Sequence, residues 1–121
     1  MPKFSCLLVT KDRLPQARKA IECFENQTLA DSELVIVDES EDGLAAYVQT
    51  LANPRIRFIR PENDNLSLGE LRNLIVQEAQ GDIVVQWDDD DWYHPDRLKR
   101  QWNAMHYTGS VACFLQRWTL A

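Results

Sequence analysis

The sequence lacks any hydrophobic run long enough to cross a membrane or to form the core of a secretory signal. Its amino-terminal apolar run extends only from Phe4 to Val9, whereas a spanning helix needs about 20 apolar residues. Basic residues are also in the minority, since 13 Lys and Arg stand against 19 Asp and Glu, for a formal net charge of -6. This balance argues against wholesale binding of nucleic acid or of an anionic membrane surface. We therefore expect no transmembrane segment and no nucleic-acid partner.

Cysteine is scarce, and its count is odd. Cys6, Cys23 and Cys113 form no C-x-x-C pattern, and the first two fall on faces that the apolar pattern predicts to be buried. Free thiols in a reducing compartment fit this usage better than a disulfide framework, so we expect a cytoplasmic protein. The sequence also contains no glycine-rich phosphate loop and no Ser-His-Asp constellation that would mark another catalytic centre.

What the sequence does contain is an alternation of short apolar runs with longer stretches of helical period. The 121 residues are enough for one domain, which we place over residues 1–121. The apolar runs predict strands at Cys6–Val9, Leu34–Val37, Ile56–Ile59, Ile83–Trp87 and Val111–Leu115. Apolar residues at helical spacing predict helices over Leu14–Phe24, Leu44–Leu51, Leu68–Ala79 and Leu98–Met105. This order predicts an α/β fold, a Rossmann-like three-layer α/β/α sandwich with a mostly parallel sheet.

Boundary signals agree with these elements. Ser67 and Glu70 form a capping-box pattern, Pro95 suits the first turn of a helix, and Gly81 suits a helix stop. The run Ile56–Arg60 carries two arginines and is therefore expected at an edge of the sheet, while the other strands lack in-and-out alternation and belong in its middle.

The most informative feature is the run of four aspartates, Asp88–Asp91, directly after the apolar run Ile83–Trp87. Adjacent carboxylates repel one another, and a divalent cation with oxygen ligands would offset their charge. Polar groups also follow the first two strands, at Thr10–Arg13 and Asp38–Asp42. Because ligands of doubly wound sheets bind beyond the carboxyl ends of the strands, these clusters are predicted to share one site. A solvated acidic loop is the alternative.

The same segments, in this order, resemble the family 2 glycosyltransferases of the GT-A fold. The pieces that carry the resemblance are Val9–Arg13, Gln27–Thr28, Leu34–Ser40, Leu71–Asn73 and Gly81–Asp91. The resemblance implies a nucleotide-sugar-binding domain that transfers a sugar from a UDP- or GDP-type donor to an acceptor that the sequence does not identify.

The resemblance also assigns roles to the acidic run. Asp88 and Asp90 match the Asp-x-Asp pair of the family, which contacts the donor's ribose and a bridging metal ion, with Asp90 the more direct ligand. Mn²⁺ or Mg²⁺ suits such oxygen donors. A cation is needed because cleavage of the sugar-phosphate bond leaves negative charge on the departing nucleoside diphosphate.

Five further residues are placed at the donor by the same resemblance. Asp38 matches the carboxylate that accepts a hydrogen bond from the nucleobase, and its alternative is a turn former at the strand end. Thr10 and Asp12 match residues that touch base and ribose. Arg13 lies near phosphate or pairs with a neighbouring carboxylate. Arg72, which precedes an asparagine, could reach the pyrophosphate, or form a surface ion pair with a glutamate.

Aromatic residues flank the acidic run on both sides. Trp87 and Trp92 could stack against a sugar, but packing in the core is the favoured interpretation. His94 is most simply a residue at the start of a helix.

The resemblance has two departures. The segment after Asp38 lacks the Asp-Gly-Ser pattern that is common in relatives, and the chain ends where relatives continue into an acceptor half that supplies the catalytic base. The base is therefore not assigned, and uncovered apolar side chains near residue 118 predict self-association into a homo-oligomer. A catalytically incomplete donor-binding module is the alternative function. A nucleotidyltransferase is a third, against which the missing glycine-rich loop speaks.

Overall fold

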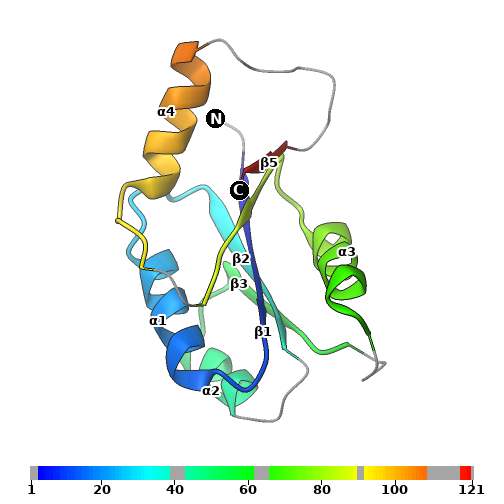
Figure 1. The fold of residues 1–121 in the computed structure, drawn as a ribbon. Helices are drawn as coiled ribbons and strands as arrows, with labels where there is room; N and C mark the ends of the chain where they lie inside the picture. Colours follow the sequence, from blue (N-terminus) through cyan, green and yellow to red (C-terminus); the bar gives the residue numbers. More distant parts are fainter. Residues whose placement is uncertain (1–2, 39–42, 62–65, 90–91, 109–117, 121) are drawn as a thin grey trace.

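The structure is a computed structural model that describes residues 3–38, 43–61, 66–89, 92–108 and 118–120. Strands and helices alternate along the chain in the predicted order (Figure 1). The elements are β1 (Phe4–Thr10), α1 (Leu14–Glu25), β2 (Ser32–Asp38), α2 (Leu44–Leu51), β3 (Ile56–Ile59), α3 (Leu68–Glu78), β4 (Ile83–Gln86), α4 (Arg97–Thr108) and β5 (Trp118–Leu120). The predicted fifth strand over Val111–Leu115 and Cys113 lie outside the described residues.

All described strands run parallel in one sheet of order β3-β2-β1-β4-β5. β1 is the central strand, with β2 on one side and β4 on the other. The arginine-bearing strand β3 lies at an edge, as its sequence predicts. β2, by contrast, is buried along its whole length, which is the pattern of a strand covered on both faces.

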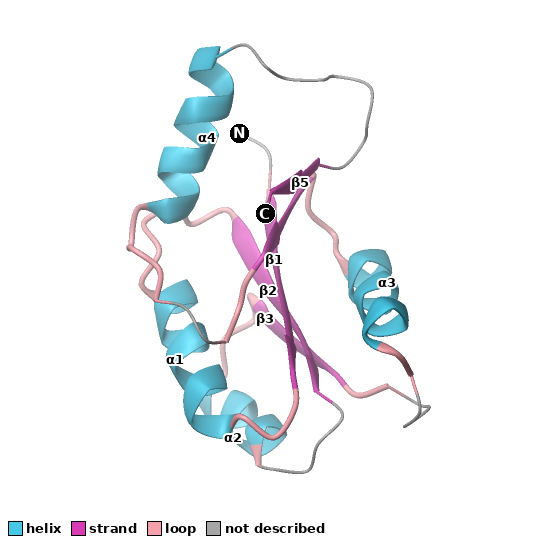
Figure 2. Cartoon of the chain, viewed as in Figure 1, coloured by secondary structure: helices cyan, strands magenta, loops and turns pink. Residues whose placement is uncertain are grey.

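Helices cover both faces of the sheet, which makes the fold a three-layer α/β/α sandwich (Figure 2). α1, α2 and the first part of α4 pack on one face, against alternate residues of the strands such as Cys6, Leu8 and Val85. α3 packs alone on the other face, against Leu7 and Val35 among others. The two hydrophobic clusters are separated by the sheet itself, so the α/β/α prediction is confirmed.

The chain reverses its direction across the sheet between β1 and β4. The connections through α1 and α2 lead away from β1 to β2 and β3, whereas α3 leads back to β4 on the opposite side of β1. Neighbouring strands whose connections lead in opposite directions leave a crevice at their carboxyl ends. α4 covers the same face of the sheet as α1, but β5 lies on the other side of β1 from β2. The crossovers β1–α1–β2 and β4–α4–β5 therefore have opposite handedness.

Of the three predicted helix-boundary signals, the capping box is found as predicted, whereas Pro95 and Gly81 have other positions relative to the helices. The capping box is present, because Ser67 accepts from the backbone N–H of Glu70, whose side chain accepts from the N–H of Ser67. Pro95 precedes α4 by two residues instead of lying in its first turn. Gly81 does not end a helix; it lies where α3's return to the sheet passes over β1, and a Cβ there would come within 2.7 Å of the Lys3 carbonyl oxygen.

Two of the cysteines are buried free thiols, as expected. Cys6 lies on β1 and Cys23 on α1, both within the cluster beneath α1. Burial raises the pKa of the Cys6 thiol far above its ordinary value, an effect that the positive charges of Arg97 and Arg55 only partly offset. The neutral thiol therefore serves as a small apolar side chain of the core.

Candidate functional site

The loops after β1 and β4 meet at the crevice between these strands. The ladder pairs Leu7 with Gln86 and continues through a hydrogen bond from the Trp87 N–H to the Leu7 carbonyl, 2.8 Å long. Two residues further along, Asp89 reaches the end of β1, and the Thr10 hydroxyl donates to its Oδ2 at 2.8 Å. The register of the two strands thus places the acidic run beside the first loop.

Arg13 joins the same contact from the start of α1. Its Nη1 lies 3.2 Å from Oδ1 of Asp89, so one carboxylate receives both Thr10 and Arg13. The Asp89 side chain is 11% exposed, whereas that of Arg13 is 51% exposed. Of the two interpretations of Arg13, pairing with a neighbouring carboxylate is the one that the structure contains. The exposed guanidinium is still partly open to solvent at the crevice.

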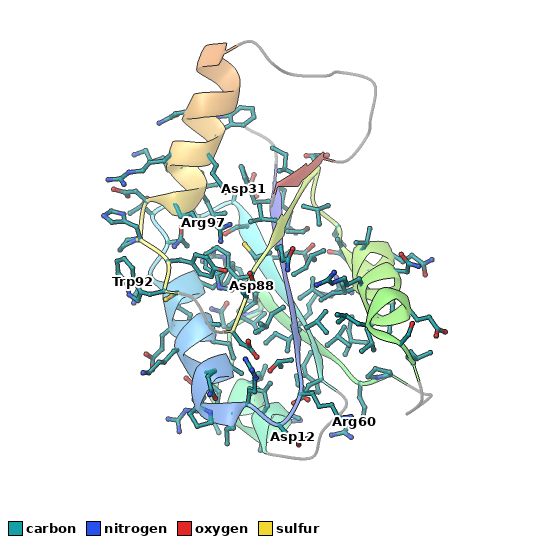
Figure 3. The ribbon with its side chains drawn as sticks, viewed as in Figure 1. Asp12, Asp31, Arg60, Asp88, Trp92 and Arg97 are labelled. Carbon is teal, nitrogen blue, oxygen red and sulfur yellow. The ribbon has the colours of Figure 1, made fainter. Side chains whose placement is uncertain are left out.

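Asp12 lies in the turn between Thr10 and Arg13, at the carboxyl end of β1 (Figure 3). Its φ angle of 54° is in the left-handed region, which aspartate tolerates better than most residues. This backbone conformation turns the chain sharply from β1 into α1.

Asp38 ends β2 and is paired in register with Thr10 of β1. It is completely buried, unlike the other aspartates of the site. A carboxylate at a buried strand end is costly unless hydrogen-bond donors or cations face it. Its position beside Thr10 is the one predicted, while the rest of that acidic segment, residues 39–42, lies outside the described residues.

Asp88 and Arg72 line one pocket, on the face that α3 covers. The pocket has a volume of about 160 Å³ and is mostly apolar, with these two charged residues and Gln86 as its polar groups. It is lined by Leu7, Val9, Leu68, Arg72, Ile75, Val76, Val84, Gln86 and Asp88. Asp88 Oδ1 accepts a hydrogen bond of 2.9 Å from Gln86 Nε2. The ion pair predicted as the alternative for Arg72 is absent among the described residues, where Glu78 pairs with Arg57 instead.

A second pocket adjoins the first, sharing Val9 and Leu68 with it. Its volume is about 400 Å³, and it opens between the end of β1, the start of α3 and the acidic run. It is lined by Val9, Thr10, Lys11, Arg13, Leu66, Leu68, Leu71 and Asp89. Residues that the sequence predicts at the donor therefore line two neighbouring hollows at the switch point of the sheet.

The metal-binding prediction depends on Asp88 and Asp90, and the structure describes only the first. Asp90 and Asp91 lie outside the described residues. Within the described part of the chain, no group of three or more Asp, Glu, His or Cys side chains is placed to hold an ion. Mg²⁺ is commonly bound by one or two carboxylates together with substrate phosphates. One half-buried carboxylate at a pocket fits that mode of binding, and does not fit an all-protein cage.

The two tryptophans beside the acidic run have opposite environments. Trp87 is 1% exposed, donates from Nε1 to the Ala20 carbonyl at 2.8 Å and packs against Tyr93, so it belongs to the core as predicted. Trp92 is 73% exposed and points outward (Figure 3). Tyr93 is itself covered by the guanidinium of Arg97, whose Cζ lies 4.1 Å from the ring centroid.

Three contributors to the site were not predicted from the sequence. Asp89 joins the two loops, the Tyr93 hydroxyl accepts from the Asp88 N–H at 2.7 Å, and Gln27 holds the segment that follows the acidic run. The register between β1 and β4 would have indicated Asp89. Gln27 depends on contacts with residues far away in sequence, and the bond from Asp88 to Tyr93, five positions apart, depends on how the loop folds.

Comparison with known proteins identifies the family of the chain. The family model described as Glycosyl transferase family 2 matches residues 5–119. The GalNAc(5)-diNAcBac-PP-undecaprenol beta-1,3-glucosyltransferase of Campylobacter jejuni is 32% identical over 94 residues, covering 75% of this chain and 30% of that protein.

Two solved structures share the fold at low sequence identity. The crystal structure of S. aureus TarS in complex with UDP superposes with a TM-score of 0.78 at 23% identity, over 87% of this chain and 32% of that one. The mannosyltransferase PcManGT from Pyrobaculum calidifontis, in complex with GDP-Man and Mn²⁺, gives 0.72 at 19% identity, over 86% and 32%.

The chain covers 30% of the C. jejuni protein and 32% of the chain in each of the two structures, of which the TarS chain is the fragment 1–349. No described helix is long and apolar enough to cross a membrane. The fold of the structure is that of the GT-A glycosyltransferases, and the family model covers nearly all of the sequence. The chain belongs to glycosyl transferase family 2.

Proposed function

We propose that this chain binds a nucleotide-sugar donor at the crevice between β1 and β4 and presents its sugar for transfer. The observation that carries the proposal is the meeting of the first loop with the acidic run, through Thr10, Arg13 and Asp89, next to two pockets. The structure of PcManGT with GDP-Man and Mn²⁺ and that of TarS with UDP support a donor of this chemical class.

In this proposal, the nucleoside and the diphosphate of the donor occupy different pockets. The nucleoside lies in the larger pocket, close to Thr10, Asp12 and Arg13, with Asp38 as the acceptor for a base N–H. The diphosphate extends toward the smaller pocket, where Arg72 offers several donors in a fork. The guanidinium of Arg13 is a second group able to approach phosphate, because it is 51% exposed and lines the larger pocket.

Asp88 and Asp90 are the residues that would hold the divalent cation, Mn²⁺ or Mg²⁺. When bound, the ion supplies positive charge that stabilises the departing nucleoside diphosphate without a proton. Neighbouring residues orient Asp88. Gln86 donates to one of its carboxylate oxygens, and the Tyr93 hydroxyl accepts from its backbone N–H. Asp89 is not a ligand in this proposal, since Thr10 and Arg13 already engage both of its oxygens.

Replacement of the proposed metal ligands tests this assignment. Asp90→Ala and Asp88→Asn should each weaken Mn²⁺-dependent nucleotide binding at least tenfold, because a metal ligand is lost while no core side chain changes. Isothermal titration calorimetry with UDP and with GDP, each with and without Mn²⁺, measures this directly.

Asp31→Asn is the matched control for these variants. It makes the same change of charge just before β2, at the amino-terminal ends of the strands, whereas the pockets lie toward their carboxyl ends (Figure 3). Its affinity should equal that of the wild type. Unaltered Mn²⁺-dependent binding in both Asp88→Asn and Asp90→Ala would refute the assignment.

Donor binding without transfer is the second candidate. It uses the same donor-site residues as the first candidate and differs only in the transfer step, for which no catalytic base is assigned among the residues that the structure describes. Release of nucleoside diphosphate from UDP- and GDP-sugars, with and without candidate sugar acceptors, distinguishes the two. Tight binding with no release above the background rate would favour the module that only binds.

A further inference from the structure

Gln27, in the loop between α1 and β2, has a side chain that the proposed donor site does not use. The residue is 7% exposed. Its Nε2 donates to the Cys23 carbonyl at 3.1 Å and to the His94 carbonyl at 2.8 Å, and its Oε1 accepts from the Leu98 N–H at 3.1 Å. One buried amide therefore connects the last turn of α1 with the first turn of α4.

Thr28 adds a second set of contacts to the same segment. Its backbone N–H donates to the Pro95 carbonyl at 2.9 Å, and its hydroxyl donates to Oδ1 of Asp96 at 2.7 Å. The hydroxyl bond also lowers the pKa of the Asp96 carboxyl. The loop after α1 runs beside the segment that leads into α4 (Figure 1).

These contacts define the far end of the acidic segment. Its near end is fixed by the β1–β4 ladder, which continues as far as the Trp87 N–H. Its far end is fixed at residues 94–98 by Gln27 and Thr28. Between them, the Asp88 N–H donates to the Tyr93 hydroxyl, so Asp88 is tied to the described segment 92–98 that follows the acidic run.

The first turn of α4 gains a specific partner from this arrangement. The first N–H groups of a helix have no partner within the helix, and a side-chain oxygen from elsewhere must satisfy them when they are buried. Oε1 of Gln27 does this for Leu98, which is completely buried. A residue 71 positions away in sequence thus caps α4.

We propose that Gln27 and Thr28 are positioning residues that hold the segment after the acidic run and thereby set the place of the metal-binding aspartates. We call the contacts of Gln27 and Thr28 with residues 94–98 the clamp. The effect of the clamp on metal binding rests on the proposed function, whereas the clamp itself is present in the chain without any ligand. Neither residue touches the donor. Both act through residues 94–98.

Hydrogen–deuterium exchange tests the clamp without any ligand. In Gln27→Met, a side chain of similar size loses every polar contact, so amides of peptides covering residues 86–98 should exchange about tenfold faster or more. Thr28→Val, which removes the hydroxyl contacts with Asp96 and with the Pro95 carbonyl, should give a smaller rise in the same peptides. It also serves as the test if Gln27→Met does not fold.

Ser32→Ala is the matched control. It removes a buried hydroxyl that donates to the Leu29 carbonyl and accepts from Arg55, at the amino-terminal edge of the sheet. It should lower the melting temperature to a similar extent and leave exchange in residues 86–98 as in the wild type. A rise confined to the Gln27 and Thr28 variants supports the clamp. No rise, or an equal rise in Ser32→Ala, overturns it.

A Mn²⁺ titration followed by electron paramagnetic resonance then links the clamp to the site. Apparent Mn²⁺ affinity should fall about tenfold in Gln27→Met and remain unchanged in Ser32→Ala, since preorganisation of ligands contributes to affinity. A wild-type protein that binds no Mn²⁺ would refute the metal assignment, while the exchange result would still decide the clamp. Faster exchange with unchanged Mn²⁺ affinity would refute the positioning role.

Discussion

At the scale of single residues, Glu33 shows how a buried charge is accommodated away from the site. The side chain, 2% exposed, accepts from the Ser5 hydroxyl at 2.6 Å and from the Gln80 N–H at 2.7 Å, and it pairs with Arg57 at 3.3 Å. Burial alone would raise the pKa of this carboxyl, but the hydrogen bonds from Ser5, Gln80 and Arg57 outweigh it, so the pKa is lowered. Glu33 thus ties β1, β3 and the end of α3 together.

Glu33→Gln should lower the free energy of unfolding at pH 7 by about 2 kcal/mol, because charge-assisted hydrogen bonds become neutral ones or are lost. A group whose pKa is lowered by folding contributes stability above its unfolded pKa of about 4.3 and loses it as the pH falls through the folded value. The difference between variant and wild type should therefore shrink below about pH 4. Urea unfolding at pH 7 and pH 3.5 measures both.

The exposed Glu22 of α1 provides the control for this experiment. Glu22→Gln should change stability by less than about 0.5 kcal/mol at either pH, as surface substitutions usually do. A Glu33→Gln deficit that grows on acidification would show that the sign of the pKa shift is wrong.

The sequence predicted the residues at strand ends better than the contacts among them. Thr10, Arg13 and Asp88 lie where the strand-end argument puts them, because the carboxyl ends of parallel strands share one edge. Asp89 accepts the hydrogen bond from the Thr10 hydroxyl because of the register between β1 and β4. Sequence periodicity does not determine this register. The clamp by Gln27 was not predictable either, since its partners are about 70 positions away.

At the scale of elements, Gly81 lies where the backbone of β1 leaves no room for a side chain. A Cβ added there would lie 2.5 Å from the Ser5 hydroxyl oxygen and 2.7 Å from the Lys3 carbonyl oxygen. Gly81→Ala should therefore destabilise the fold by about 3 kcal/mol, since β1 cannot move away without disturbing both neighbouring strands. Chemical denaturation monitored by circular dichroism measures the effect.

Gly69→Ala gives the opposite expectation and serves as the control. Its added Cβ would approach only the Ser67 hydroxyl, at an ordinary 3.9 Å, within the first turn of α3. A helical glycine replaced by alanine should raise stability by about 0.5–1 kcal/mol. Equal effects of the two substitutions would contradict the close-approach explanation of Gly81.

The boundaries of the elements from β1 to α4 were predicted to within a few residues, and the differences have a common cause. β1 extends from Phe4 to Thr10, beyond the predicted Cys6–Val9, because Ser5 and Thr10 are polar yet buried with hydrogen-bond partners. α4 begins at Arg97, after a Pro95 that its pattern placed within the first turn. Hydropathy marks the apolar centre of an element, whereas its ends depend on contacts made elsewhere in the fold.

At the scale of the whole molecule, ligand binding should raise stability. A donor nucleotide and Mn²⁺ at 100 times the dissociation constant would add about 2.7 kcal/mol, which corresponds to a rise in melting temperature of roughly 10 °C for a domain of this size. A thermal-shift panel of UDP, GDP, ADP and CMP, with Mn²⁺ or with EDTA, measures it. The Asp88→Asn variant should show at most about half of this rise, because its affinity is at least tenfold weaker. The absence of any shift in the wild type would contradict donor binding.

The overall topology was predictable because strands and helices alternate strictly along the chain. This alternation favours a parallel sheet with crossover helices, and the arginines of β3 indicated its edge position. The distribution of helices between the faces was not predictable. Three helices cover one face and α3 alone covers the other, with α4 held on the α1 face by Gln27 and Leu98.

Because β1 is the central strand, an error in its register would disturb both the packing of the two cores and the candidate site. Its alternate side chains, such as Leu7 and Leu8, are buried in opposite cores, and its last residue, Thr10, contacts the acidic run. A slip of one residue would exchange the two cores and also carry Thr10 away from Asp89. The wrong alignment is thus disfavoured by both cores, and the register that packs the two cores is also the register that brings Thr10 to Asp89.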